Sequence, residues 1–372
     1  MVLKSSPVVM SSDAIPEPLE ATLDQLVEGD FREKWEAAKQ LIDWGDPAIA
    51  HLAKLLQSEE DDWEVRWFAA RTLGQFDHPA ALEALVQLLQ QTQEPELVAI
   101  AAEGLSHFGE RGVAALVPLL DQPPHRLTGV QALASIQHSS VFVPLLAAAE
   151  DADATVRATA LAALASFHHP EVDNLLLSAV QDVNTGVRRE AITHLGLRAY
   201  LLNQMNLVDT LLPGLWDIHP EVNEATAIAL GRLGTETAVA ALARVLASPH
   251  TPTNLQRRLI QALGWIEKES ALLALVAALQ KLPQELQIIV IETLTRLQTP
   301  QLQQRAGDML CDWLKTGWYQ SSEDKNALRP AIALALGTLR HQPAIPLLQA
   351  LKADDDPQTR LYAEAALRQF LD

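Results

Sequence analysis

The chain has 372 residues, of which 48% are hydrophobic and 20% charged, a composition typical of a folded protein with room for more than one ordinary domain. Its formal net charge of −19 argues against nucleic acid and anionic membrane surfaces as partners, because both are bound through an excess of Lys and Arg. A single cysteine, Cys311, excludes an intramolecular disulfide and favours a reducing compartment, so we expect a cytoplasmic protein.

The N-terminal residues 1–20 are rich in Ser, Pro and Glu, and we expect them to form a disordered tail. They contain no apolar run long enough for a signal peptide, and the apolar stretch at residues 270–279 is far shorter than a membrane span. Residues 13–64 hold fifteen Asp or Glu and four Lys or Arg. This acidic segment is compatible with a basic protein partner.

An internal repeat organises residues 21–372. The stretch WEVRWFAARTLG, which ends at Gly74, recurs in eleven copies, and the copies that end at Leu41, Leu105, Leu133, Leu294 and Leu336 are weaker. Each copy is identified by one anchor leucine, and the anchors follow one another at intervals of 28 to 42 residues: Leu41, Leu73, Leu105, Leu133, Leu164, Leu195, Leu230, Leu263, Leu294, Leu336 and Leu367. Apolar or small residues spaced by three, four and seven predict a helix in each copy. A second apolar segment, often begun by Pro, predicts a second helix.

A single helix pair of this kind cannot bury its own apolar face, so neighbouring pairs must stack. We therefore predict an all-α fold, an α-solenoid of about eleven helix pairs that forms a single array over residues 21–372. The long step between Leu294 and Leu336 predicts an irregular insertion at residues 315–326.

Aromatic residues exceed what the repeat requires at two places. Trp63, Trp67 and Phe68 stand where other copies carry small or polar residues. They either seal the N-terminal end of the stacked core or form an anchor for a partner or a flat ligand. In the insertion, Trp318 and Tyr319 either pack on the adjacent helices or contact a partner. These five residues are the candidates for partner binding.

Arginine recurs seven residues before the anchor in six of the eleven copies: Arg66, Arg126, Arg157, Arg188, Arg329 and Arg360. A fixed arginine in successive copies predicts a ladder along the array. We expect each guanidinium to pair with an acid or a carbonyl of the neighbouring copy, and the alternative is an anionic ligand.

Four histidines lie five residues beyond their anchors, in the turn between the two helices: His78, His138, His169 and His341. We predict turn and capping roles for them. Neighbouring copies would hold two such histidines about 8–10 Å apart, which is too far for both to bind one metal. The sequence also lacks H-E-x-x-H, C-x-x-C and EF-hand motifs, so we expect no intrinsic metal site.

Cys311 falls where other copies carry Ala53, Val86 or Leu348, which predicts a partly buried side chain that packs as a small hydrophobe. The alternative is a thiol that helps to ligate a cluster held by a partner. The adjacent Asp308 and Asp312 would raise the thiol pKa, which does not favour a reactive thiolate.

The pattern V-R-x-x-A-x-x-A-L-G, followed by a turn and A-x-P-x-L-x-x-L, resembles HEAT repeats over residues 24–372. The version of about 31 residues resembles the phycobilisome-lyase-like HEAT repeats common in cyanobacteria. The length, the unbroken array and the single cysteine resemble most closely a HEAT-repeat partner of an A-type iron–sulfur carrier. The stretch WEVRWFAARTLGQF also resembles the E-type subunits of phycobilin lyases, which help to attach a bilin to a phycobiliprotein.

We therefore expect a non-catalytic scaffold, monomeric by itself and without an intrinsic cofactor, that holds a protein partner along a concave face. In the family that it resembles, second helices line that face. The resemblance implies an iron–sulfur carrier as the partner. If the two proteins share an Fe–S cluster, Cys311 is the candidate ligand on this chain. The alternative is a lyase subunit or phycobiliprotein chaperone, with bilin bound at Trp63, Trp67 and Phe68 beside Asp61, Asp62 and Glu64.

Overall fold

The computed structural model describes residues 16–58, 62–279, 281–316 and 325–371, and within these ranges it consists of α-helices and short 3₁₀ turns without any strand. The predicted all-α solenoid is confirmed. The chain divides into two compact units, Met1–Val172 (unit 1) and Asp173–Asp372 (unit 2), and each is described by itself.

The anchor leucines lie in eleven helices of the described chain, which we call the first helices. Ten of the anchors are at most 1% exposed, and Leu367 is partly exposed. The first helices are α2 (Phe31–Trp44), α4 (Trp63–Leu73), α6 (Pro95–Ser106), α8 (Arg126–Ser135), α10 (Ala154–Leu164), α12 (Thr185–Leu195), α14 (Pro220–Leu233), α16 (Thr253–Trp265), α18 (Gln284–Leu294), α20 (Lys325–Thr338) and α22 (Pro357–Arg368).

A second helix follows the turn in most repeats. The second helices are α3 (Asp46–Gln57), α5 (Pro79–Gln91), α7 (Glu110–Leu120), α9 (Phe142–Ala148), α11 (Pro170–Ala179), α15 (Glu236–Leu246), α17 (Glu269–Leu279), α19 (Pro300–Thr316) and α21 (Ile345–Leu351). The 3₁₀ turns η1 (Ser139–Val141) and η5 (Gln342–Ala344) lead into α9 and α21. An additional helix, α1 (Glu17–Glu28), packs on α2 and begins inside the expected tail, whose residues 1–15 lie outside the described residues.

The repeat of α12 is irregular in a way that the sequence analysis did not predict. Its second segment is split into η2 (Ala199–Asn203), α13 (Leu207–Leu211) and η3 (Leu212–Trp216). Pro213 cannot donate a backbone hydrogen bond, and Gly214 is unfavourable in a helix interior, so one continuous helix is disfavoured here. The expected insertion begins at the end of α19, and Trp318 and Tyr319 lie outside the described residues.

The glycine that follows the anchor leucine explains how closely neighbouring first helices pack. A Cβ atom added to Gly231 would lie 2.9 Å from the Cβ of Ala262 in the next first helix. At Gly337 the added atom would lie 2.6 Å from the Cα of Ala366. Real Cβ atoms do not approach so closely, so these two junctions can stack in this way only with glycine after the anchor leucine.

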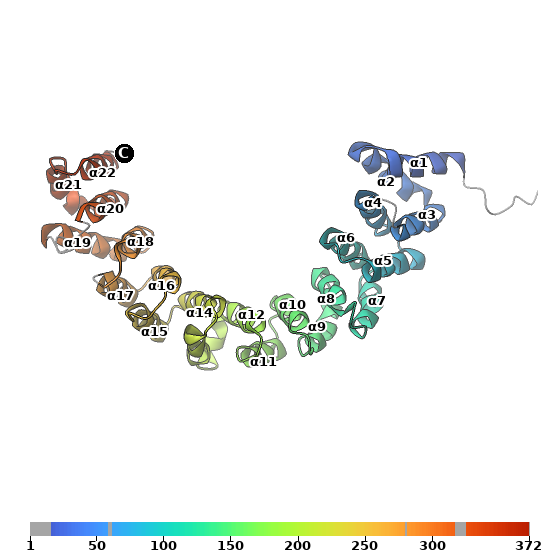
Figure 1. Cartoon of the computed structure of the whole chain (residues 1–372), viewed down its shortest axis with the longest axis horizontal. Coiled ribbons are helices and arrows are strands. Elements are labelled where there is room, and N and C mark those ends of the chain that lie inside the picture. The colour runs from blue at the N-terminus through green and yellow to red at the C-terminus, as the bar shows by residue number, and fades with distance from the viewer. Residues whose placement is uncertain (1–15, 59–61, 280, 317–324, 372) are drawn as a thin grey trace, which may run out of the picture. The chain divides into compact units, whose positions relative to one another are not determined.

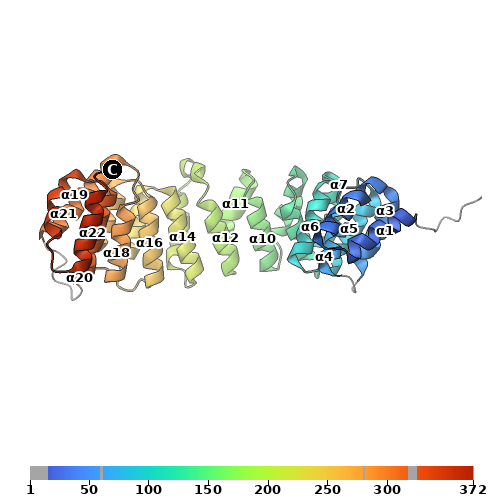
Figure 2. The same ribbon diagram turned by 90° about the horizontal axis from the view of Figure 1, so that it is seen from above.

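First and second helices form separate layers within each unit (Figure 1). Seen from above, neighbouring first helices such as α14 and α16, or α20 and α22, run side by side (Figure 2), and they contact each other. Taken by itself, each unit has its first helices on the inner side of its curve and its second helices on the outer side (Figure 1). The expectation that second helices line the concave face is therefore wrong for both units.

Candidate functional site

A cluster of aromatic rings joins α2 and α4 in unit 1. Trp35 and Trp67 each stand six residues before their anchors, so the packing of α2 on α4 brings them to the same face. Phe68 lies beneath them with none of its surface exposed. Its ring centroid is 5.4 Å from that of Phe31, 6.2 Å from that of Trp35 and 5.2 Å from that of Trp67, in edge-to-face geometry.

Two cations cover the tryptophan rings of this cluster. The guanidinium carbon of Arg71 is 5.0 Å from the ring centroid of Trp35 and 5.5 Å from that of Trp67. The ammonium group of Lys39 is 5.8 Å from the Trp35 centroid. In both helices the cation follows its tryptophan by four residues, which places the two on one helix face.

A pocket of about 200 Å³ adjoins the rings, lined by Trp35, Lys39, Ile42, Arg71 and Gln75 among others. We call it the N-terminal aromatic pocket. Its volume is below the range of about 300–1,000 Å³ that is usual for small-molecule sites. The pocket therefore suits one flat or apolar side chain better than an extended ligand.

The structure separates the three aromatic residues that the sequence grouped as partner-binding. Trp67 is half-buried and does not line the pocket itself, but its ring is covered by Arg71, which does, whereas Trp63 is 57% exposed at the start of α4. Phe68 is fully buried and supports the cluster from beneath, so it presents no surface to a partner in this structure. Trp35 was not among the candidates, although its position six residues before Leu41 matches that of Trp67 before Leu73.

The recurring arginine links adjacent repeats. Arg188 donates from Nη1 to the carbonyl oxygens of Asp182 at 2.8 Å and Val183 at 3.1 Å, in the loop before its own helix. Its Nε and Nη2 donate to the two carboxylate oxygens of Asp217, before α14, at 2.9 and 3.1 Å. We call this contact between consecutive repeats the Arg–Asp clamp, and it recurs as Arg126–Asp151 and Arg329–Asp354. The predicted pairing with a neighbouring acid is confirmed at these junctions, but the bonded carbonyls of Arg188 belong to its own repeat.

The clamp changes the electrostatics of Asp217. Burial acts to raise the pKa of its carboxyl group, but hydrogen bonds from Arg188 and from the His219 backbone outweigh this effect. The pKa of Asp217 therefore lies below its ordinary value, and the group is ionised near neutral pH.

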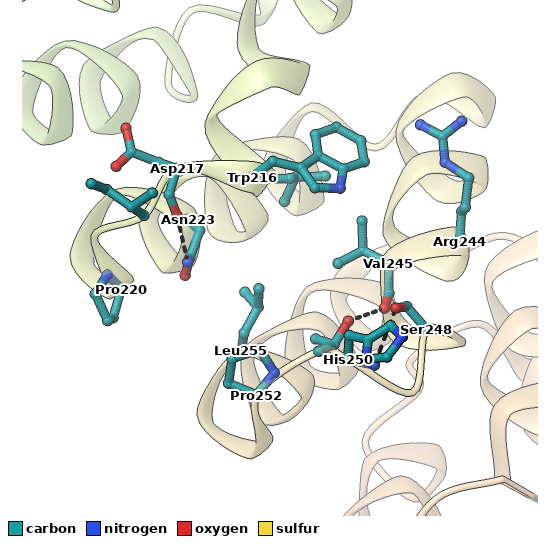
Figure 3. Close-up of a pocket in the computed structure, with 13 residues that line it drawn as sticks. Trp216, Asp217, Pro220, Asn223, Arg244, Val245, Ser248, His250, Pro252 and Leu255 are labelled. Carbon is teal, nitrogen blue, oxygen red and sulfur yellow. Dashed lines mark hydrogen bonds between the residues drawn. The ribbon is translucent and has the colours of Figure 1, made fainter.

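The clamp is absent one repeat later, between α14 and α16. Asn223 occupies the position of Arg188, and His250 occupies that of Asp217. Asn223 donates from Nδ2 to the carbonyl oxygen of Asp217 at 3.2 Å, while its Oδ1 is buried with no hydrogen-bond partner among the described residues. A cavity of about 430 Å³ opens at this place (Figure 3). We call it the Trp216 groove.

The walls of the Trp216 groove are mainly apolar and come from η3, the loop before α14, and the end of α15 with the loop that follows it. Trp216 is 54% exposed and Ile218 is 88% exposed. Arg244 places its guanidinium 5.3 Å from the Trp216 ring centroid, across the groove from Asn223 (Figure 3). The sequence analysis missed this site, although Asn223 interrupts the recurring arginine and could have signalled it.

Cys311 is only 3% exposed and packs inside α19, as predicted for a small hydrophobe. Burial raises the pKa of its thiol to about 11, and Asp308 and Asp312 act in the same direction against the effect of Lys315. The thiol is therefore neutral near neutral pH and shielded from solvent. A role as a cluster ligand stays a prediction that would require α19 to open locally.

The turn histidines cap helices or turns at three of the four predicted positions. The Nδ1 atoms of His78, His138 and His169 accept backbone N–H groups two residues ahead at 3.1, 3.2 and 3.3 Å. His341 is instead 5% exposed, with its Nε2 3.1 Å from a carboxylate oxygen of Asp308. Across the described ranges, no group of three or more His, Cys, Asp or Glu side chains is arranged to hold a metal ion.

Comparison with known families gives two matches. The family model of HEAT repeats matches residues 19–106, 113–196 and 173–254. The model of the PBS lyase HEAT-like repeat matches residues 328–354. A search of curated proteins found no match. No helix in the part of the chain that the structure describes is long and apolar enough to cross a membrane.

Among solved structures, Kap121p is similar over 96% of this chain and 46% of its own, with 15% identity and a TM-score of 0.58. Kap95p with RanGDP is similar over 95% of this chain and 61% of its own, with 13% identity and a TM-score of 0.55. Importin beta is similar over 94% and 57%, with 13% identity and a TM-score of 0.54. The chain thus spans about half the length of these proteins, and identities this low show a shared fold alone.

Proposed function

Because the chain belongs to the HEAT-repeat family, we propose that it is a non-catalytic scaffold that binds another protein at the N-terminal aromatic pocket. The observation that carries the proposal is the pair of partly exposed tryptophans, Trp35 and Trp67, held rigidly on the buried Phe68. Rigid aromatic side chains around a small pocket are favoured anchors in protein interfaces, because they bury much area at little conformational cost. Two structural neighbours are described in complexes, Kap95p with RanGDP and Kap95 with Nup1, which supports the same use of the fold.

The partner that we propose is an A-type iron–sulfur carrier. In this proposal the scaffold is monomeric and binds the carrier in the cytoplasm. Support comes from the resemblance of the array to a carrier-binding HEAT protein. In this proposal the cluster stays on the carrier's own ligands, since the Cys311 thiol is neutral and buried.

Calorimetric titration with a purified A-type carrier, in apo and cluster-loaded forms, tests this proposal. Trp67→Ala should weaken binding about tenfold or more, since anchors of this kind contribute about 2 kcal/mol or more. Trp265→Ala is the matched control, because Trp265 is 54% exposed but lies on α16 in unit 2. Equal losses in the two variants, or no binding by the wild type, would contradict the proposal.

A Cys311→Ser variant examines the shared-cluster idea separately. Because the thiol is buried, we expect the carrier to retain its cluster equally well with wild-type and variant scaffold. Faster cluster loss with the variant would instead identify Cys311 as a ligand.

A second candidate is a bilin-binding lyase subunit or phycobiliprotein chaperone, favoured by the match of residues 328–354 to the PBS lyase HEAT-like repeat. The N-terminal aromatic pocket, at about 200 Å³, is small for an open-chain tetrapyrrole. Titration with phycocyanobilin decides the matter. A shifted bilin spectrum with quenched tryptophan fluorescence would support this candidate, and the absence of both would dismiss it.

A further inference from the structure

One repeat junction in unit 2 contains a cavity where the preceding junction contains a guanidinium group. Between α12 and α14, Arg188 spans from the carbonyl oxygens of Asp182 and Val183 to the carboxylate of Asp217. Between α14 and α16 the same register places Asn223 opposite His250, and neither side chain bridges the gap. The Trp216 groove therefore occupies the place that an arginine side chain fills one repeat earlier.

The groove keeps the acceptors that a guanidinium group would use. The carbonyl groups of Asp217 and Ile218 correspond in register to those of Asp182 and Val183, which accept from Arg188. The Asp217 carbonyl oxygen accepts one hydrogen bond from Asn223 and has a second lone pair for another donor. Asn223 adds its Oδ1, which is buried without a partner among the described residues. A buried acceptor without a hydrogen bond is unfavourable, so a donor that entered the groove would relieve that penalty.

The walls also suit the remainder of an arginine-containing segment. The partly exposed ring of Trp216 can cover the methylene groups of an arginine or stack on its planar head. Ile218 lines the groove and offers apolar surface to a neighbouring residue of the same segment. Pro220 and Pro252 line it as well (Figure 3). A free amino acid would leave this apolar surface uncovered, which favours a peptide as the occupant.

The charged and titratable side chains around the groove do not block the hydrogen-bond acceptors near Asn223. Arg244 lies against Trp216 on the side away from Asn223 (Figure 3). The carboxylate of Asp217 is already paired with Arg188. His250 stands where the clamp has an aspartate, and a neutral imidazole can accept a hydrogen bond through its unprotonated nitrogen. Recognition here is local, because unit 2 holds 21 acidic and 18 basic residues.

We propose that the Trp216 groove binds an arginine side chain of a protein partner, whose guanidinium takes the place of the missing Arg–Asp clamp. An apolar residue next to that arginine covers Trp216 and Ile218. This inference rests on the proposed scaffold function, because the arginine belongs to a bound protein, and it adds a contact site separate from the N-terminal aromatic pocket.

The test uses the full chain labelled with 5-fluorotryptophan, in which fluorine NMR resolves the eight tryptophans and a Trp216→Phe variant assigns the signal of Trp216. The probe is the capped tripeptide acetyl-Leu-Arg-Leu-amide. It should shift the Trp216 signal in a saturable manner. Asn223→Arg supplies the guanidinium from within and should weaken peptide binding at least tenfold. Gln287→Arg makes the same kind of change at the corresponding position of α18, which does not line the groove, and should leave binding unchanged.

Matched peptides define the results that would overturn the proposal. The citrulline peptide, which is uncharged but close in shape, should bind at least fivefold more weakly, and equal binding would exclude guanidinium recognition. Binding of acetyl-Leu-Glu-Leu-amide would assign the groove to acidic partners through Arg244. Free arginine binding as tightly as the peptide would assign it to a small molecule.

Folding of the Asn223→Arg variant is checked by circular dichroism, and Asn223→Met, which fills the cavity without a cation, serves as a second blocking variant. Unchanged peptide binding in both folded variants would refute the proposed position of the arginine. Carrier binding is tested with a variant in unit 1, and peptide binding is tested with variants in unit 2. Failure of one proposal therefore does not affect the interpretation of the other experiment.

Discussion

Two surfaces of the molecule pair a tryptophan with an arginine, and they are built in opposite ways. At the N-terminal aromatic pocket, Trp35 and Trp67 rest on the buried ring of Phe68. At the Trp216 groove, the tryptophan borders a cavity that remains because Asn223 is too short to form the clamp. A repeat array can therefore gain a binding surface either by adding side chains to a helix face or by losing one at a junction.

The two surfaces also lie in different electrostatic surroundings. Unit 1 holds 26 of the 47 acidic residues and only 10 of the 28 basic residues. Long-range attraction of a basic protein should therefore act mainly on unit 1 and weaken with added salt. Binding in the Trp216 groove depends on close hydrogen bonds and apolar contact, and it should respond less to salt.

Removal of the support beneath the first surface should have the largest effect on stability. We expect Phe68→Ala to lower the free energy of unfolding of the α2–α4 region by about 3–5 kcal/mol, the usual cost of emptying a buried aromatic site. Hydrogen exchange measured by mass spectrometry on peptides from α2 and α4 reads this local change. Trp67→Ala is the control and should cost less, since Trp67 is only half-buried. A larger loss of unfolding free energy for Trp67→Ala than for Phe68→Ala would mean that Trp67, and not the buried Phe68, stabilises the aromatic cluster.

Removal of the clamp should convert the closed junction into one like the groove. Arg188 and Asp217 have side chains that are 13% and 14% exposed, so Arg188→Ala leaves a buried carboxylate without its partner. We expect a loss of about 2–4 kcal/mol, read from hydrogen exchange in α12 and α14. Arg189→Ala provides the matched control, because the neighbouring Arg189 side chain is 45% exposed and should change stability by less than about 0.5 kcal/mol.

The sequence predicted the elements of both surfaces better than the surfaces themselves. The spacing of the anchor leucines and the small residues gave the helices and their stacking, because periodicity reports which face of a helix is buried. It also identified Trp67, whose size exceeds what the repeat requires. It did not separate the buried Phe68 from its neighbours, because adjacent residues on a helix differ in burial according to which helix packs against them.

The Trp216 groove was harder to predict because it depends on an absence. Asn223 and His250 are ordinary residues, and only their shared register against Arg188 and Asp217 shows that a clamp is missing. The break at Pro213 and Gly214, which ends in the exposed Trp216, also lies in a segment whose apolar pattern resembles the second helices of other repeats. The spacing of apolar residues predicts which helix face is buried. It does not predict where a cavity remains or which helix layer lies on the inner side of each unit.

The acid limit of stability should distinguish the clamped junction from a junction without the clamp. The pKa of Asp217 is lowered in the folded chain, so its stabilising contribution is complete above its ordinary pKa of about 4 and is lost as the pH falls through the lower folded value. In Arg188→Ala the pKa of Asp217 should lie closer to its ordinary value, because burial is then opposed only by the hydrogen bonds from His219. The stability gap between wild type and variant should therefore narrow by on the order of 1 kcal/mol between pH 5 and pH 3, measured by urea denaturation. A constant gap would show that Asp217 does not titrate differently in the two chains.

Placing an arginine at residue 223, at the junction between α14 and α16 that lacks the clamp, should have the smallest effect on stability. It tests most directly whether the missing clamp explains the groove. In Asn223→Arg the new guanidinium can reach the carbonyl groups of Asp217 and Ile218, which correspond to the acceptors of Arg188, but it meets His250 instead of an aspartate. We therefore expect a gain of only about 0.5–1 kcal/mol from hydrogen bonds without an ion pair, read from hydrogen exchange in α14 and α16. The double variant Asn223→Arg, His250→Asp should add the missing carboxylate and gain more than the sum of the two single changes. Strict additivity would mean that the groove is shaped by the broken segment before α14 rather than by the absent clamp.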